Sequence, residues 1–345
     1  MKSKLKLSNN NMQESNENIE TIEVEMNANF RNNHRKPLDI CIVGETNLDL
    51  VLYGLPEEMP VERELLGSGF EMNLGGSSSI LTHNLAVLGT QVGFVSEVGN
   101  DAMGDIAQGY LKGSGVDLSH FRQKAGAKTG VTLLLPHGKK RHILTYPGVM
   151  SELRVEDLDF AYLTSARHFH LSSLFLQTGL HPGLPQLFDD LRSAGLTVSL
   201  DTNDDPTGAW HGVLDLLLDK VDILLPNEDE LLQIADAATT EQALDKLAPR
   251  LPLIVVKCGT RGALVQRGKE RKWVPPFVVE PVDTIGAGDS FNAGFLNAWL
   301  AGEDPMRAAA MGNLTGALST LRPGGVEAHR DVSLRTQFLG THALS

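Results

Sequence analysis

The chain has 345 residues, of which 41% are hydrophobic and 21% are charged, values that exclude a fibrous or fully disordered protein. Acidic residues outnumber basic ones by 43 to 30, and the resulting net charge of −13 argues against a nucleic-acid partner. Both cysteines lie in apolar runs, no stretch reaches membrane-spanning length, and no signal-peptide core is present, so we expect a cytoplasmic protein without a membrane partner.

Residues 1–36 are polar and rich in Asn and Glu, as in SNNNMQESNENIE. They carry too little apolar surface to offset the entropy of ordering, so we expect a flexible polar tail there. Strand-like and helix-like segments alternate over 37–335, which predicts an α/β domain with a mostly parallel central sheet covered on both faces. Residues 336–345 are expected to form a C-terminal tail.

The predicted elements follow one another in a regular order along this domain. Apolar runs predict strands at 38–44, 91–99, 166–174, 196–201, 221–227 and 251–259. Periodic segments with glycine or acidic boundaries predict helices at 101–115, 183–195, 228–237, 240–248, 289–302 and 304–321.

Two stretches interrupt this alternation. Residues 50–74 lack helical periodicity, and residues 128–148 are typical of a hairpin that turns at PHGKK. We expect these discontinuous stretches to meet as a small β lid beside the sheet. His168 and His170 alternate on one strand, where packed or hydrogen-bonded histidines are favoured over a metal site because no third ligand is apparent.

The segment DTIGAGDSF, residues 283–291, runs from a glycine loop directly into a helical pattern. Unpaired amides at a helix start bind anions, and glycines let the backbone approach phosphate oxygens. An aspartate at position 289 fits this place if it takes the proton of a hydroxyl that attacks the phosphate. The alternative is that Asp289 is a helix N-cap. A dinucleotide fingerprint is rejected, since Phe291 stands where its third glycine belongs, and no P-loop motif occurs.

DTIGAGD is similar to the C-terminal signature of the ribokinase-like (PfkB) carbohydrate kinases. Further segments resemble this family in the family's order: GETNLD, NLGG, VGNDAMGD, GSGVDLSHF, LPNEDE, VVKCGTRGA and NLTGALSTLRPGG. The resemblance implies a ribokinase-like three-layer sandwich with a small β lid. It also implies phosphoryl transfer from ATP, with Mg²⁺, to a hydroxyl of a small sugar or sugar derivative.

The resemblance assigns roles around the phosphates. It makes Asp289 the catalytic base, and it makes the anion hole from the backbone amides of Gly286, Ala287 and Gly288. The residues expected at the nucleotide are Asn227, Lys257, Gly259, Gly262, Thr284 and Asn313. Asn227 and Glu230 are expected around Mg²⁺ through water, although both are also common helix-start residues. Asp283 lies in the segment that contributes to a monovalent-cation site in the family, which raises the question of K⁺.

The resemblance also assigns acceptor-side residues. Asn47 and Asp49 match a pair that binds a sugar diol. The other residues expected near the substrate are Gly75, Gly76, Asp201 and Arg141. Gly75 and Gly76 either allow close approach of the backbone or act as a hinge for the lid. Turn formation alone would also explain Asp201. Arg141 either contacts an anionic substrate or is solvated.

One departure from the family pattern bears on the substrate. Ile80 stands where many sugar kinases carry a substrate-binding Asn, and Asn84 comes one helical turn later. We therefore expect an acceptor other than ribose, or a less polar one. The alternatives are a nucleoside kinase of the same fold and a catalytically silent sugar or nucleotide sensor. The β lid is also the expected surface for a homodimer.

Overall fold

The computed structural model describes residues 36–137 and 140–342. From Leu38 onwards the chain forms one compact unit. Apart from Lys36, the expected polar tail lies outside the described residues.

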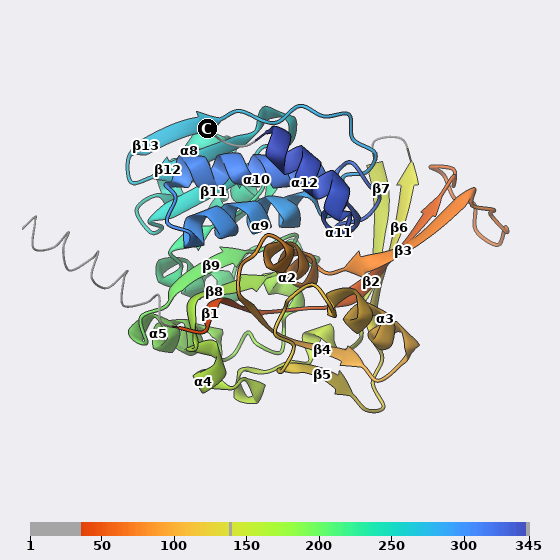
Figure 1. Ribbon diagram of the computed structural model, residues 1–345, viewed down its shortest axis with the longest axis horizontal. Helices are drawn as coiled ribbons and strands as arrows, with labels where there is room; N and C mark the ends of the chain where they lie inside the picture. The colour runs from red at the N-terminus through yellow and green to blue at the C-terminus, as the bar shows by residue number, and fades with distance from the viewer. Residues whose placement is uncertain (1–35, 138–139, 343–345) are drawn as a thin grey trace, which may run out of the picture. The chain divides into compact units, whose positions relative to one another are not determined.

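Nine strands of the described chain form the large sheet, in the spatial order β13-β12-β11-β10-β9-β8-β1-β4-β5 (Figure 1). The pairs β11–β12 and β12–β13 are antiparallel, and the other pairs are parallel. The strands are β1 (Leu38–Val43), β4 (Val92–Gly99), β5 (Phe121–Lys124), β8 (Ala166–Ser172), β9 (Thr197–Asp201), β10 (Ile223–Leu224), β11 (Leu253–Lys257), β12 (Ala263–Arg267) and β13 (Glu270–Val274).

Helices cover both faces of this sheet, so alternate residues of a strand enter different cores. Cys41 and Val43 of β1 pack in one core, whereas Ile40 and Ile42 pack in the other. The first core also contains residues of α4 (Phe160–Leu163), α5 (Leu184–Ser193), α6 (Val213–Leu217), α7 (Glu228–Ala235) and α8 (Thr240–Leu247). The second contains residues of α2 (Ser77–Val87), α3 (Ala102–Leu111), α9 (Ala287–Leu300) and α10 (Pro305–Ser319). The α/β fold class predicted from the alternation of elements is confirmed.

The shorter elements connect these layers. Helices α11 (Glu327–Arg330) and α12 (Val332–Thr341) follow α10. The 3₁₀ turns are η2 (Gly148–Ser151), η3 (Val155–Asp157), η4 (Leu174–Leu176), η5 (Leu218–Lys220) and η6 (Gly259–Arg261). Among the residues that the structure describes, no helix combines the length and apolar character needed to cross a membrane.

A second sheet of four strands lies beside the large one and forms the expected lid (Figure 1). Its order is β3-β2-β6-β7, and β6 and β7 form the hairpin predicted at 128–148. The strands are β2 (Asn47–Tyr53), β3 (Gly69–Gly75), β6 (Gly130–His137) and β7 (Lys140–Tyr146). Only residues 44–46 separate β1 from β2, so the chain passes directly from the large sheet into the lid.

The C-terminal segment differs from the expectation. Residues from 336 were expected to form a tail, yet α12 continues to Thr341. Asp331 caps this helix by accepting a hydrogen bond from the Leu334 amide at 3.0 Å. The ring of His342 lies 4.6 Å from that of Phe338 and 5.8 Å from that of Phe277, so the last turn contacts the segment before α9.

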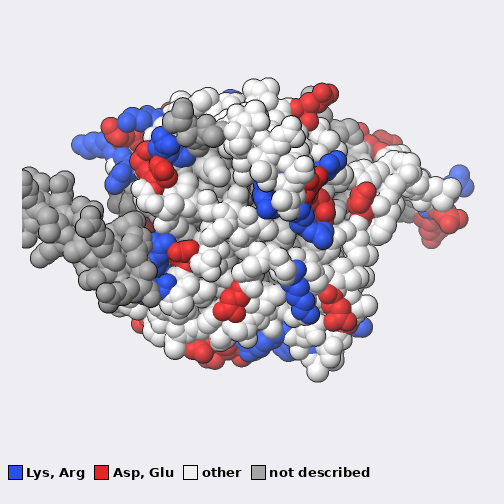
Figure 2. Space-filling view, in the orientation of Figure 1, with Lys and Arg blue, Asp and Glu red and all other residues white. Residues whose placement is uncertain are grey.

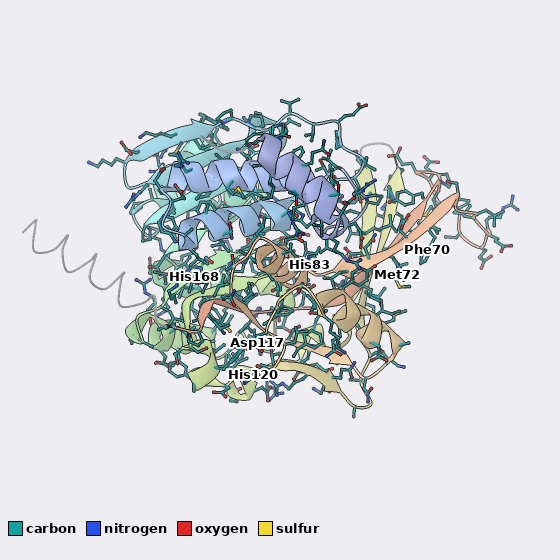
Figure 3. All side chains as sticks on the ribbon, viewed as in Figure 1. Phe70, Met72, His83, Asp117, His120 and His168 are labelled. Carbon is teal, nitrogen blue, oxygen red and sulfur yellow. The ribbon has the colours of Figure 1, made fainter. Side chains whose placement is uncertain are left out.

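The two histidines of β8 form a buried hydrogen-bonded ladder (His168 is labelled in Figure 3). His168 bonds Thr197 at 2.6 Å and Ser199 at 2.7 Å. His170 bonds the same Ser199 at 2.6 Å and Ser172 at 2.8 Å. Burial lowers the pKa of each imidazole to about 3, so both are neutral near pH 7. The structure therefore has the hydrogen-bonded arrangement that the sequence favoured.

A third buried histidine, His329 of α11, lacks such partners. Its side chain is fully buried, and neither ring nitrogen has a hydrogen-bond partner among the described residues. Burial, followed by the nearby His83 and Arg335, lowers its pKa to about 3. Below its ordinary pKa of 6.5, the unfolded chain binds a proton at this residue that the folded chain does not, so acid destabilises the fold.

Replacing His329 with Met should therefore remove the loss of folding stability that this buried imidazole causes at acid pH. At pH 7 the free energy of unfolding should equal or exceed that of the wild type, because an unpartnered polar ring is lost. At pH 5 the variant should gain a further ~2 kcal/mol over the wild type, from about 1.5 pH units at about 1.4 kcal/mol each. Urea unfolding at both pH values measures this difference. Equal pH dependence in the two proteins would contradict it.

Candidate active site

The loop before α9 places a helix N-terminus at the carboxyl edge of the large sheet. Gly286 is the N-cap residue, with φ of 70°, and a Cβ atom added there would lie 2.5 Å from the Gly325 Cα. Glycine is thus required for both conformation and space. Ala287, Gly288 and Asp289 form the first turn, so the backbone cap is Gly286 and the N-cap alternative for Asp289 is wrong.

Asp283 fixes this loop. Its carboxylate accepts hydrogen bonds from the amides of Ile285 and Gly324, each at 3.0 Å. The amide of Asp283 donates to the Thr320 carbonyl at 3.2 Å. Its side chain is therefore used within the protein, so any role at a monovalent cation falls to the main chain of the loop.

Asp289 is half-buried and lies among other acidic groups. Burial first, and then the charge of Asp201, raise its pKa to about 7. Glu45 adds to the rise, whereas Lys257 and a hydrogen bond from Ser77 oppose it. A carboxyl group that titrates near neutral pH is suited to accept a proton and later release it.

Lys257, Asp201 and Asn292 come from three different elements and meet beside Asp289. The Lys257 ammonium lies 2.5 Å from Asp201 Oδ2, and the Asn292 amide donates to the same oxygen at 2.5 Å. The Asn203 amide donates to Asp201 Oδ1 at 3.3 Å. Asp201 has no exposed side-chain surface, so the protein itself occupies both of its oxygens.

Asn227 and Glu230 form a capping box at the start of α7. The Asn227 side chain accepts from the Glu230 amide, and the Glu230 carboxylate accepts from the Asn227 amide, both at 2.8 Å. The helix-start role is therefore present, and the role around Mg²⁺ stays a prediction. Burial and the charge of Asp201 also raise the pKa of Glu230 to about 7, which shows that it belongs to the same acidic cluster as Asp289.

A cavity of about 330 Å³ opens beside the loop predicted to form the anion hole. Its lining includes five of the six residues predicted at the nucleotide, together with two of the anion hole: Lys257, Gly259, Gly262, Thr284, Asn313, Ala287 and Gly288. Asn227 is the predicted residue that does not line it. Much of its remaining wall is an apolar segment that sequence reasoning did not single out: Pro276, Phe277, Val278, Val279 and Pro281. The Asn313 side-chain amide donates to the Pro275 carbonyl at 2.9 Å and so holds this wall.

Four of the residues predicted on the acceptor side, Asn47, Asp49, Gly75 and Arg141, lie in the lid. Asp49 on β2 pairs with Asn73 on β3 and with Thr132 on β6. A Cβ atom added to Gly75 would lie 2.1 Å from Asp49 Oδ1, so this glycine permits close approach. Burial, followed by the charge of Asp289, raises the pKa of Asp49 to about 8, and the charge of Arg141 opposes this rise. Arg141 itself lies on exposed β7.

Gly76 and Asn47 are two further residues predicted near the substrate. Gly76, with φ of 85°, is the N-cap of α2. The Asn47 side-chain amide donates to Thr132 Oγ1 at 2.7 Å. Its carbonyl oxygen is buried without a hydrogen-bond partner among the described residues. An unpaired buried oxygen is a natural acceptor for a sugar hydroxyl.

Ile80 stands where many sugar kinases carry a substrate-binding Asn. Both Ile80 and the nearby Asn84 make their contacts within the protein. Ile80 is buried and packs against Gly325. Asn84 donates to Ser290 Oγ at 2.9 Å and to the Gly325 carbonyl at 3.0 Å. The Asn84 amide is thus used within the protein, and the expectation of an acceptor other than ribose stays a prediction.

Sequence reasoning missed Glu45, which lies within GETNLD. Its carboxylate accepts hydrogen bonds from Ser78 at 2.6 Å, Ser173 at 2.7 Å and Gln177 at 3.0 Å. These bonds tie the start of α2 to the segment after β8. A carboxylate directly after the first strand was the available signal, but its partners lie 33 or more residues away.

Comparisons with known proteins agree with this architecture. Residues 37–331 match the model of the pfkB family of carbohydrate kinases. An ATP-dependent ribose-1-phosphate kinase of Halopiger xanaduensis is 32% identical over 253 residues, which cover 72% of this chain and 81% of that protein. A 2-dehydro-3-deoxygluconokinase of Bacillus subtilis is 30% identical over 305 residues, which cover 81% and 92%.

Solved structures show the same fold. A putative Ribokinase II from E. coli, crystallised with ATP and Mg²⁺, is similar with a TM-score of 0.77 and 24% identity. The likeness covers 88% of this chain and 100% of that chain. The ribokinase-like fold expected from DTIGAGD and its companion motifs is thereby confirmed. The chain belongs to the PfkB family and is a carbohydrate kinase.

Proposed function

We propose that this kinase transfers the γ-phosphoryl group of ATP, in the presence of Mg²⁺, to a hydroxyl of a small sugar or sugar derivative. The position of Asp289 carries this proposal. Its carboxyl group lies in the first turn of a helix whose unpaired amides attract anions, and its pKa is about 7. The proposed base thus lies one to three residues after the proposed phosphate site in the chain.

In the proposed step, the acceptor oxygen bonds to the γ-phosphorus while Asp289 takes the hydroxyl proton. The bond from that phosphorus to the β–γ bridging oxygen breaks, and ADP leaves. The amides of Gly286, Ala287 and Gly288 stabilise the charge on the phosphoryl oxygens. The apolar wall of the 330 Å³ cavity suits the base and ribose of the nucleotide.

The residues present fit a Mg²⁺ ion that retains several waters. Asn227 and Glu230 offer an amide and a carboxylate, which are hard oxygen donors. Within the described parts of the chain, no group of three or more His, Cys, Asp or Glu side chains could hold a metal. We therefore assign these two residues to an ion held largely through water and phosphate oxygens. When bound, Mg²⁺ supplies positive charge that neutralises the phosphates.

On the acceptor side, the proposal assigns Asp49 and Asn47 to the sugar hydroxyls. Asp49 is buried at the base of the lid, and its raised pKa leaves it able to donate as well as accept. The relatives named above act on a sugar phosphate and on a sugar acid by their names. An anionic acceptor would meet the positive charge of Arg141, which already acts on Asp49.

The direct test is an ADP-release assay over pentoses, hexoses, sugar acids, sugar phosphates and nucleosides, with Mg²⁺ and K⁺ varied. We expect ADP release that depends on one sugar class and on Mg²⁺. Release with nucleosides alone would favour the nucleoside kinase. Sugar binding by calorimetry without ADP release from any compound would favour the silent sensor. A response to K⁺ would support the cation site at the Asp283 loop.

Asp289→Asn should lower kcat by about 10²–10⁴-fold while nucleotide binding persists, because the general base is lost. The wild-type kcat/KM should rise as pH increases through about 7, since the base must be ionised. The ratio of wild-type to variant rate should accordingly be larger at pH 8 than at pH 5.5. Steady-state assays with the best acceptor measure both quantities. A variant rate near the wild-type rate at pH 8 would remove Asp289 from catalysis.

Gly288→Ala should separate folding from function. The added Cβ would lie 3.7 Å from the Lys257 ammonium, an ordinary contact, so the melting temperature should not fall. The same methyl group would intrude on the anion hole, and kcat/KM for ATP should drop by about 10²-fold. In Gly286→Ala, by contrast, positive φ and the 2.5 Å approach to Gly325 should destabilise the fold. Full activity in Gly288→Ala would contradict the anion-hole assignment.

The lid also presents an apolar outer face. Phe70, Leu133, Leu144 and Tyr146 are exposed there by 59%, 42%, 52% and 56% (Phe70 is labelled in Figure 3). Alternation along paired strands places these four on one face, opposite Asp49 and Thr132. Charged side chains gather at the far end of the lid, in the 57–64 loop (Figure 2). We assign this apolar face to a second copy of the chain, because four large apolar side chains exposed together mark an interaction surface.

Replacing Phe70 and Leu144 together by Ser should then shift the protein from dimer to monomer, because apolar surface no longer becomes buried between copies. Analytical ultracentrifugation of wild type and variant measures this change. Phe160→Ser, at an exposed phenylalanine on α4, is the matched control and should remain a dimer. A monomeric wild type at assay concentrations would overturn the lid dimer.

A further inference from the structure

Lys257 is held in one position by neighbours from two other elements. It ends β11, and its side chain is 11% exposed. Asp201, at the end of β9, pairs with its ammonium, and Asn292 of α9 holds the same carboxylate oxygen. Asp201 is thereby saturated by protein donors and offers no free surface to a sugar.

The ammonium lies between the nucleotide cavity and the base. Lys257 lines the cavity, and among the residues described it is the one Lys or Arg in that lining. A Cβ atom on Gly288 would lie 3.7 Å from its Nζ, so the charge lies against the anion-hole backbone, one residue before Asp289. The phosphoryl group must pass from the nucleotide in this cavity to an acceptor hydroxyl beside Asp289.

The charges around Lys257 keep it a cation. Burial alone would lower its pKa, but the charges of Asp201, Glu230 and Asp289 outweigh burial and raise it. On the sheet side, His170 is neutral, because burial and the charge of Lys257 lower its pKa to about 3. A fixed cation among carboxyl groups is what an incoming, highly anionic phosphoryl group requires.

We propose that Lys257 contacts the γ-phosphoryl oxygens during transfer, and that Asp201 and Asn292 are positioning residues that aim it. This inference deepens the proposed function and depends on it for the direction of transfer. Lys257 keeps its protons throughout: the γ-phosphorus exchanges its bond to the bridging oxygen for one to the acceptor oxygen, and Asp289 takes the acceptor proton. The role first assigned to Asp201, substrate binding, passes to the lid residues.

The test compares nucleotides with and without a γ-phosphoryl group. In Lys257→Met, calorimetry should give a Kd for ADP close to the wild-type value and a Kd for AMP-PNP about tenfold or more weaker, the loss of one charge-assisted hydrogen bond. The value of kcat should fall by about 10²–10³-fold. Lys220→Met is the matched control, because Lys220 also pairs with an aspartate at 2.5 Å but lies on the surface. It should change none of these quantities.

A second variant tests the positioning role. Asp201→Asn retains Lys257 but removes its anchor, so kcat should fall while the KM for the sugar stays within about twofold. A rise in that KM with kcat unchanged would return Asp201 to substrate binding. If Lys257→Met lost affinity equally for ADP and AMP-PNP, or lost no affinity for either, the proposed contact of Lys257 with the γ-phosphoryl oxygens would be overturned. If the wild type phosphorylates no sugar, the proposed function fails, whereas the comparison of ADP with AMP-PNP still decides the role of Lys257.

Discussion

Crowding of carboxyl groups at the carboxyl edge of the large sheet is the constraint on which the site depends. Asp49, Asp201, Glu230 and Asp289 arrive from the lid, β9, α7 and α9; the charge of Asp289 raises the pKa of Asp49 and of Glu230, and the charge of Asp201 raises the pKa of Glu230 and of Asp289. Burial and mutual repulsion bring the pKa values of Asp49, Glu230 and Asp289 to about 8, 7 and 7. Lys257 provides the compensating charge for Glu230 and Asp289, and Arg141 provides it for Asp49. The site is therefore poised to gain from positive charge brought with the nucleotide.

Close backbone approaches hold this crowded arrangement together. Gly286 packs on Gly325, and Gly75 packs on Asp49, at distances that leave no room for a side chain. Glu45 joins the start of α2 to the segment after β8 through neutral donors. Because α2 also carries Ser77, which hydrogen-bonds Asp289, these contacts connect Glu45 through α2 to Asp289. The position of Asp289 is thus set by loops at the carboxyl ends of the strands, where ligands of open α/β sheets commonly bind.

The sequence predicted what is encoded locally. Alternating apolar runs predicted the parallel core, and DTIGAGD predicted a phosphate-binding helix start at Asp289, because glycines and an acid occur together there. The antiparallel hairpin of β12 and β13 was missed, because each strand has only five residues and β13, at the edge of the sheet, is almost wholly exposed. The pairing of Lys257 with Asp201 spans 56 residues and depends on which strands neighbour each other, so no local pattern reveals it. Asn227 and Glu230 show a different limit of sequence patterns. The same two residues form a helix capping box and also suit a metal, so their identity alone does not decide between the two roles.

The central claim is that the Asp289 carboxylate shares the proton of the acceptor hydroxyl. A crystal structure with AMP-PNP, Mg²⁺ and the acceptor found by ADP release tests it most directly. The account predicts a carboxylate oxygen of Asp289 within about 3 Å of one sugar hydroxyl, which in turn faces the γ-phosphorus. An acceptor hydroxyl bound to another residue, with Asp289 turned from both sugar and nucleotide, would contradict it.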